Sequence, residues 1–115
     1  MMIRIKNLRA QTLIGAYDDE RQARRTVTLN LAIDYDHRNA LITDALGETL
    51  DYAVIEQSIV EALPLQHFVL LESLAEYVAK IVMSYPLVRE VTVEIDKPGA
   101  LKHADSVSVI HTAAR

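Results

Sequence analysis

The sequence predicts an α+β protein in which two strands, two helices and two further strands follow one another along the chain. Residues 26–35 and 91–95 alternate apolar and polar side chains, as strands with one buried face do. Residues 71–85 repeat their apolar side chains at helical spacing, which is typical of an amphipathic helix. Hydrophobic residues make up 50% of the 115-residue chain, enough to bury one core. We therefore expect a single domain over residues 1–115.

The first two strands are predicted from period-2 patterns. Near the N-terminus, Ile3 and Ile5 alternate with Arg4 and Lys6, and we expect this strand to run to about Ile14. The second strand has the clearest alternation of the chain, with one face made by Val27, Leu29, Leu31, Ile33 and Tyr35. A helix would mix the two sets of side chains around its circumference, so only a strand separates them.

Two helices are expected between the strand pairs. The first covers about residues 51–63, with Asp51 as the candidate N-cap and Pro64 as the residue that ends it. The second covers residues 71–85 and ends at Pro86.

The last two strands are expected at residues 91–95 and 106–109. Because each strand pair has a short connection, we expect an antiparallel sheet with both helices on its apolar face. The edge strands of such a sheet expose unpaired backbone groups. Edge-to-edge joining of several copies into a closed barrel would remove these edges, whereas a monomer with charged edges is the alternative.

Composition excludes several functional classes. A net charge of −4, without a basic stripe interleaved with aromatic residues, argues against a nucleic-acid partner. The absence of Cys excludes disulfides, Cys-type zinc sites and thiol nucleophiles, and the four His residues lack metal-ligand spacing, so we expect no metal site. No apolar segment reaches the length of a membrane span or resembles a signal peptide, so we expect a cytoplasmic protein without a membrane partner.

Four places in the sequence look unlike ordinary packing. Glu20 follows an apolar strand that ends at Gly15, and Tyr52 lies in the first turn of a predicted helix. Glu72 follows two leucines at the start of the next helix, and Lys97 stands at a strand end before a tight turn. Each residue also has an ordinary structural interpretation, such as a solvated loop acid, a helix staple or a charge that suits the helix dipole.

Taken together and in order, these segments resemble the dihydroneopterin aldolase family. The features shared with the whole family are Ile14-Gly15 leading to Glu20, Leu50-x-Tyr52, Leu71-Glu72, and Lys97 followed by Pro98-Gly99-Ala100. Residues 3–9, 93–97 and 104–108 are similar to the branch of the family that epimerises dihydroneopterin triphosphate. Pro98-Gly99 after the lysine is instead more typical of the aldolases.

The resemblance implies the tunnelling fold (T-fold), in which four subunits close a barrel and two such rings commonly stack into an octamer. A homo-oligomer, tetramer or octamer, with active sites at the subunit interfaces is therefore expected. The implied small-molecule partner is a reduced pterin, and no cofactor is expected.

The resemblance also implies roles for individual residues. Glu72 would bind the pterin ring together with the main chain of Leu71, and Lys97 would transfer protons. Tyr52 from an adjoining subunit would carry the hydroxyl proton, and Glu20 would position Lys97 and a water.

The implied reaction is epimerisation at C2′ of 7,8-dihydroneopterin triphosphate, to dihydromonapterin triphosphate, by retro-aldol cleavage and re-addition. One alternative is an aldolase that releases glycolaldehyde and 6-hydroxymethyl-7,8-dihydropterin for folate biosynthesis. A second is a non-catalytic pterin-binding or structural oligomer, against which stands the joint presence of the four candidate residues.

A triphosphate substrate needs basic side chains around its tail. The densest basic clusters that flank the candidate segments are Arg21, Arg24 and Arg25 on one side and Lys102-His103 on the other. A solvated basic surface is an equally good interpretation of both clusters.

Overall fold

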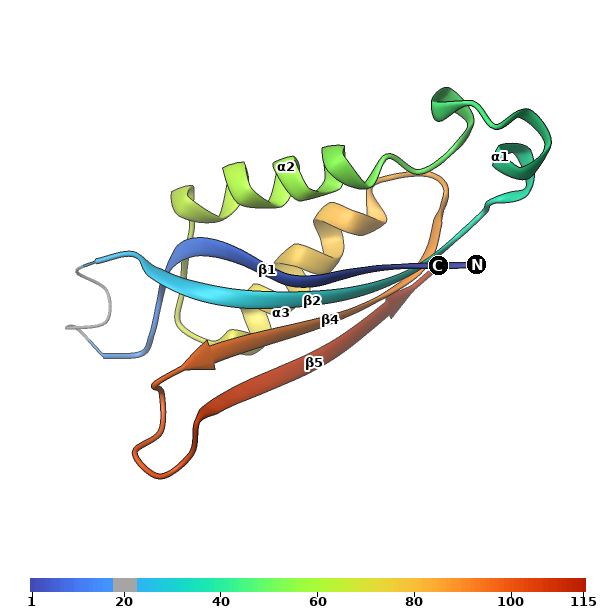
Figure 1. Ribbon diagram of the computed structural model, residues 1–115. Helices are drawn as coiled ribbons and strands as arrows, with labels where there is room; N and C mark the ends of the chain where they lie inside the picture. Colours follow the sequence, from blue (N-terminus) through green and yellow to red (C-terminus); the bar gives the residue numbers. More distant parts are fainter. Residues whose placement is uncertain (18–22) are drawn as a thin grey trace.

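The computed structural model describes residues 1–17 and 23–115 of the chain. Within these residues the strands are β1 (Met2–Ile14), β2 (Arg25–Tyr35), β3 (His67–Phe68), β4 (Val88–Pro98) and β5 (Ser106–Ala114). The helices are α1 (Arg38–Thr43), α2 (Tyr52–Ala62) and α3 (Leu71–Met83), with 3-10 turns η2 (Leu46–Glu48) and η3 (Leu63–Leu65). Figure 1 shows α2 and α3 on the same side of the curved sheet, which is the α+β layering that the sequence predicts.

The sheet has the strand order β3-β1-β2-β4-β5. The pairs β1/β2, β2/β4 and β4/β5 are antiparallel, as predicted, while the short β3 runs parallel to the end of β1 and was not predicted. Consequently, β1 and β4 end at the same end of the sheet at which β2 and β5 begin. We call this the Lys97 end. The opposite end of the sheet, where the N-terminus lies, is the Met1 end (Figure 1).

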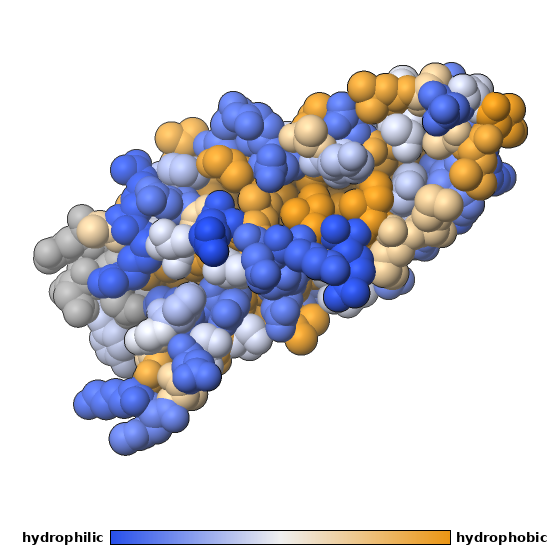
Figure 2. Space-filling model, viewed as in Figure 1, coloured by the Kyte–Doolittle hydropathy of each residue, from blue (hydrophilic) through white to orange (hydrophobic). Residues whose placement is uncertain are grey.

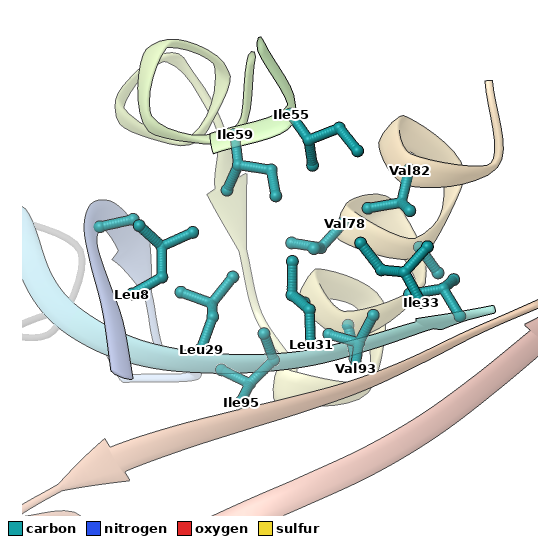
Figure 3. Packing of buried hydrophobic residues seen from close by; sticks show 14 of the residues in the cluster. Leu8, Leu29, Leu31, Ile33, Ile55, Ile59, Val78, Val82, Val93 and Ile95 are labelled. Atoms are coloured by element: carbon teal, nitrogen blue, oxygen red, sulfur yellow. The ribbon is translucent and has the colours of Figure 1, made fainter. Parts of the chain in front are cut away.

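Alternate residues of β2 and β4 build the core. Val27, Leu29 and Ile33 of β2 are fully buried, as are Val93 and Ile95 of β4. Facing them are buried side chains from the two longer helices, among them Ile55, Ile59, Val78 and Val82 (Figure 3). Leu74 of α3 is fully buried as well. Burying each of these aliphatic side chains stabilises the fold by about 1.5–3 kcal/mol, so the alternation seen in the sequence is the main source of stability.

The two longer helices begin and end close to where the sequence predicts. The carboxylate of Asp51 accepts a hydrogen bond of 3.0 Å from the backbone N–H of Ala53, so Asp51 is the N-cap of α2. Helix α3 stops at Met83, two residues before the predicted end at Tyr85. There the guanidinium of Arg115 donates to the carbonyls of Met83 and Tyr85, which satisfies acceptors that the helix leaves open. In the described part of the chain, no helix has the length and apolarity that crossing a bilayer requires.

The segment between β2 and α2 contains structure that the sequence did not predict. Helix α1 and the turn η2 have no buried residue, so no apolar periodicity marks them. Leu41, Ile42 and Leu46 are instead largely exposed. Figure 2 shows the resulting apolar surface at the Met1 end of the molecule.

The core predicts a strong difference between two leucines. Leu29→Ala removes a fully buried side chain and should lower the free energy of unfolding by about 2–5 kcal/mol. Leu65→Ala, the same chemical change at a position 79% exposed, should change it by less than about 0.5 kcal/mol. Urea unfolding followed by circular dichroism measures both, and equal losses would contradict the assignment of the core.

Candidate active site

Lys97 lies in a cleft at the Lys97 end of the sheet. The cleft has a volume of about 590 Å³. Its walls are made by Tyr17, Arg24, Arg25, Thr26, Lys97, Pro98, Gly99 and Ala100. Tyr17 comes from the segment after β1, and the other residues come from the chain at the start of β2 and from the end of β4 with the turn that follows it.

The strand period explains the position of Lys97. Val93 and Ile95 of β4 are buried on the helix-covered face, and Lys97 continues that row two residues further on. Its side chain is only half-buried because β4 extends at this point beyond the part of the sheet that the helices cover. The chain then turns back at Gly99, whose φ of 75° is a conformation that favours glycine. The strand end and the turn expected around Lys97 are thus both present.

Leu71 and Glu72 form the first turn of α3. The segment before them is tied to the end of β1, since the N–H of Gly15 donates to the carbonyl of Phe68 at 3.0 Å. The hydroxyl of the buried Thr12 donates to the carbonyl of Gln66 at 3.2 Å. Because β1 ends at the Lys97 end, α3 starts toward that end too. Leu71 is half-buried against the core, whereas Glu72 is exposed and is not one of the residues that line the Lys97 cleft.

Tyr52 lies at the other end of the molecule. It is the first residue of α2, is 62% exposed, and lines a separate hollow of about 430 Å³ together with Met1 and Tyr35. Tyr35 ends β2 and Arg25 begins it, and an 11-residue strand spans roughly 33 Å. Within one copy of the chain, Tyr52 therefore cannot reach the cleft that contains Lys97.

The remaining candidates divide between the cleft and the surface. Glu20 and Arg21 lie outside the described residues. Arg24 and Arg25 line the cleft, whereas Lys102-His103 is exposed in the connection between β4 and β5 and does not line it. Tyr17 also lines the cleft, although the sequence interpretation assigned it no role. Its position two residues after Gly15, where β1 has just ended, is the signal that could have found it.

Asp36 and Arg38 form an ion pair that shifts the pKa values of both groups. Asp36 accepts two hydrogen bonds from the guanidinium of Arg38, at 2.9 and 2.7 Å, just after β2 at the Met1 end. These bonds hold the pKa of Asp36 well below its ordinary value and raise the pKa of Arg38. The pair stabilises the turn into α1. Within residues 1–17 and 23–115, no three His, Asp or Glu side chains are grouped so as to hold a metal ion.

Comparison with known proteins decides the family. A sequence model described as dihydroneopterin aldolase (FolB) matches residues 3–112, which is almost the entire chain. This chain belongs to the dihydroneopterin aldolase family. The resemblance drawn from Glu20, Tyr52, Glu72 and Lys97 is thereby confirmed at the level of the family.

Curated members of the family with two different activities are similar to this chain. The dihydroneopterin triphosphate 2′-epimerase of Pseudomonas aeruginosa is 36% identical over 107 residues, which cover 93% of this chain and 87% of that protein. The dihydroneopterin aldolase of Escherichia coli strain K12 is 31% identical over 106 residues, covering 92% of this chain and 87% of that protein.

A solved structure from the family has the same fold. The crystal structure of Escherichia coli dihydroneopterin aldolase in complex with neopterin superimposes with a TM-score of 0.92 at 29% identity, covering 99% of each chain. The predicted T-fold of a single chain is confirmed by this similarity. The assembly of several copies into a barrel stays a prediction.

Proposed function

We propose that this chain inverts C2′ of 7,8-dihydroneopterin triphosphate by retro-aldol cleavage and re-addition. The observation that carries the proposal is the higher identity to an epimerase, 36%, than to an aldolase, 31%, over nearly the same length. A pterin substrate is supported by the related Escherichia coli aldolase, whose structure holds neopterin.

The substrate itself supplies the electron sink for this reaction. When the C2′ hydroxyl loses its proton, the C1′–C2′ bond breaks, a carbonyl forms at C2′, and the bonding electrons move into the C6–N5 imine of the ring. The products are a ring enamine and an aldehyde that carries the triphosphate. If the aldehyde turns before the C1′–C2′ bond forms again, C2′ is inverted. The protein has to hold the ring, retain the aldehyde and move protons.

Glu72 is proposed to bind the pterin ring. A pterin presents the N3–H and the 2-amino group side by side, and one carboxylate accepts both hydrogen bonds, which provides orientation as well as affinity. The exposed position of Glu72 in the first turn of α3 leaves its carboxylate accessible to a ligand. The backbone of Leu71, which precedes it, is proposed to contact the same edge of the ring.

Lys97 is proposed to transfer protons through a water molecule. Its half-buried side chain lines a cleft large enough for a ligand and open to solvent, as a proton-transfer group in an accessible site requires. Glu20 is proposed to orient Lys97 and this water.

Tyr52 is proposed to act from a neighbouring copy of the chain. Its place at the Met1 end of α2, far from Lys97 in the same copy, supports a site completed between two copies. The hydroxyl of Tyr52 would then carry the proton of the substrate hydroxyl to and from Lys97.

An aldolase activity is the second candidate. Pro98-Gly99 directly after Lys97 is the feature that favours it, because this pair is more typical of the aldolase branch. The first steps are shared, and the outcome differs only in whether the aldehyde leaves before the C1′–C2′ bond forms again. One site can therefore catalyse both reactions in a ratio set by how long the aldehyde is retained.

A product assay on two substrates tests the proposal. Incubation with dihydroneopterin triphosphate should yield mainly the C2′ epimer, and incubation with unphosphorylated dihydroneopterin should yield less epimer and more 6-hydroxymethyl-dihydropterin. Chromatography of the oxidised, fluorescent pterins separates these products. Cleavage as the main reaction of both substrates would establish the aldolase instead, and turnover of neither would reject both.

The proposed roles of Lys97 and Glu72 predict different losses in two variants. Lys97→Ala should lower kcat by at least about 10²-fold, the usual contribution of a general acid–base group, and leave pterin binding largely intact. Glu72→Ala should weaken pterin binding by about tenfold or more, since two hydrogen bonds to a charged group are lost.

Helix α3 provides matched controls. Lys80 and Glu76 form an exposed ion pair of 3.4 Å, and Lys80→Ala and Glu76→Ala should leave both kcat and pterin affinity near the wild-type values. Binding is measured by titration of pterin fluorescence. Equal losses of binding and turnover in Lys97→Ala and Glu72→Ala would contradict the separate roles.

A further inference from the structure

The Lys97 cleft concentrates positive charge in a chain whose net charge is −4. Three of its lining residues, Arg24, Arg25 and Lys97, are cationic, and none of the described lining residues is acidic. Within residues 1–17 and 23–115, neither arginine forms a salt bridge with a carboxylate. In the described part of the cleft, an anionic ligand would therefore meet cationic side chains.

The sheet register aligns Arg25 with Lys97. Thr28 of β2 is the outermost residue paired with β4, opposite Asp96, and continuing this register by one residue sets Val27 across from Lys97. Arg25 lies two residues beyond Val27 on β2 and therefore shares its face of the sheet. Residues in this diagonal relation have Cα atoms roughly 7–8 Å apart, so the two cationic side chains lie within reach of one ligand.

The side chain of Arg24, which also lines the cleft, is anchored to the turn η3 that follows α2. Its Nε donates a hydrogen bond of 2.8 Å to the carbonyl of Pro64 in η3. This bond fixes one edge of the guanidinium plane, and the two terminal nitrogens form the other edge. A guanidinium presented in this way suits bidentate binding of a phosphate group.

The substrate chemistry places the phosphates close to the reacting atoms. In a dihydroneopterin triphosphate the tail starts at C3′, which is directly bonded to C2′, the carbon whose hydroxyl group loses its proton. If Lys97 exchanges protons with the C2′ hydroxyl, the first phosphate of the tail must lie within a few bond lengths of the site at which Lys97 acts. The neighbouring groups that can neutralise it are Arg24 and Arg25.

We propose that Arg24 and Arg25 form a subsite for the triphosphate tail and determine the preference for phosphorylated over unphosphorylated substrate. This inference rests on the proposed function, because it takes the triphosphate of that reaction as the ligand. It chooses between the two basic clusters of the sequence, since Lys102-His103 does not line the cleft. Retention of the phosphorylated aldehyde by the same arginines would also favour re-addition over release.

The test compares Arg24→Ala, Arg25→Ala and the double variant with Lys102→Ala, which removes an equal charge from the neighbouring β4–β5 connection. Removing each arginine should lower kcat/KM for the triphosphate, relative to that for dihydroneopterin, by about tenfold, as expected for loss of one charge-assisted hydrogen bond to phosphate. Arg25→Lys should recover part of this preference because it keeps the charge. Lys102→Ala should leave the ratio within about twofold of the wild-type value, as expected for an exposed charge away from the ligand.

Binding of inorganic triphosphate, measured by isothermal titration calorimetry, gives a readout that does not need the reaction. The wild-type protein should bind it and the double variant should bind it at least about tenfold more weakly, with urea unfolding used to show that both are folded. If the wild-type protein converts neither pterin, the proposed function fails, while the calorimetry still decides whether the arginines bind a polyphosphate. If the wild-type protein epimerises the triphosphate and the arginine variants keep the wild-type preference and anion affinity, the subsite alone is rejected.

Discussion

The antiparallel pairing of β2 with β4 is the constraint on which the rest of this structure depends. Eight residues of alternating polarity on β2 are paired with a similar alternation on β4, and a shift by one residue would move every buried side chain to the opposite face. The helices α2 and α3 cover only one face, so their burial selects this register. The same register carries Lys97 onto the helix-covered face just beyond Ile95, and it sets Arg25 diagonally across from it. The cleft is thus a direct consequence of how the core is aligned.

The length of these strands separates the proposed catalytic groups. Strand β2 is 11 residues long and runs along the whole core. Tyr52 lies near one end of it, at the Met1 end, and Lys97 lies at the opposite end of the same chain. If both act on one substrate, the tyrosine must come from another copy. Among residues 1–17 and 23–115, β5 is paired only with β4, and most of β1 is paired only with β2, so the sheet leaves two edges at which another copy can add. The assembly proposed for the function is therefore compatible with the described part of the chain.

Sequence reasoning predicted the elements whose side chains alternate between core and solvent. Strand β2, the two longer helices and the cap at Asp51 were found because each has a periodic apolar pattern or a local capping signal. Helix α1 was missed because it buries nothing, and the parallel pairing of β3 was missed because two residues cannot display a period. The ends of β4 and β5 extend beyond the predicted strands, since backbone pairing continues where the apolar pattern stops.

The candidate site was predictable only in part for the same reason. Residue type and local position made Lys97 and Glu72 candidates, and the structure puts both toward the same end of the sheet, although Glu72 does not line the Lys97 cleft. Their roles stay predictions. The contribution of Arg24 and Arg25 to that cleft depends on strand register, which is a tertiary property, and so does the distance between Lys97 and Tyr52. Glu20 lies outside the described residues, and its role stays a prediction.

The central claim is that Lys97 and Tyr52 serve one site from two copies of the chain, and subunit mixing tests it most directly. Lys97→Ala and Tyr52→Phe would each be purified, then mixed in equal amounts, unfolded in urea and refolded together, with each variant treated alone as the control. Random assembly joins an intact Lys97 to an intact Tyr52 in about one quarter of the interfaces, so turnover should recover to roughly a quarter of the wild-type rate. A mixture no more active than the two separate variants would contradict a site that takes Lys97 from one copy and Tyr52 from another.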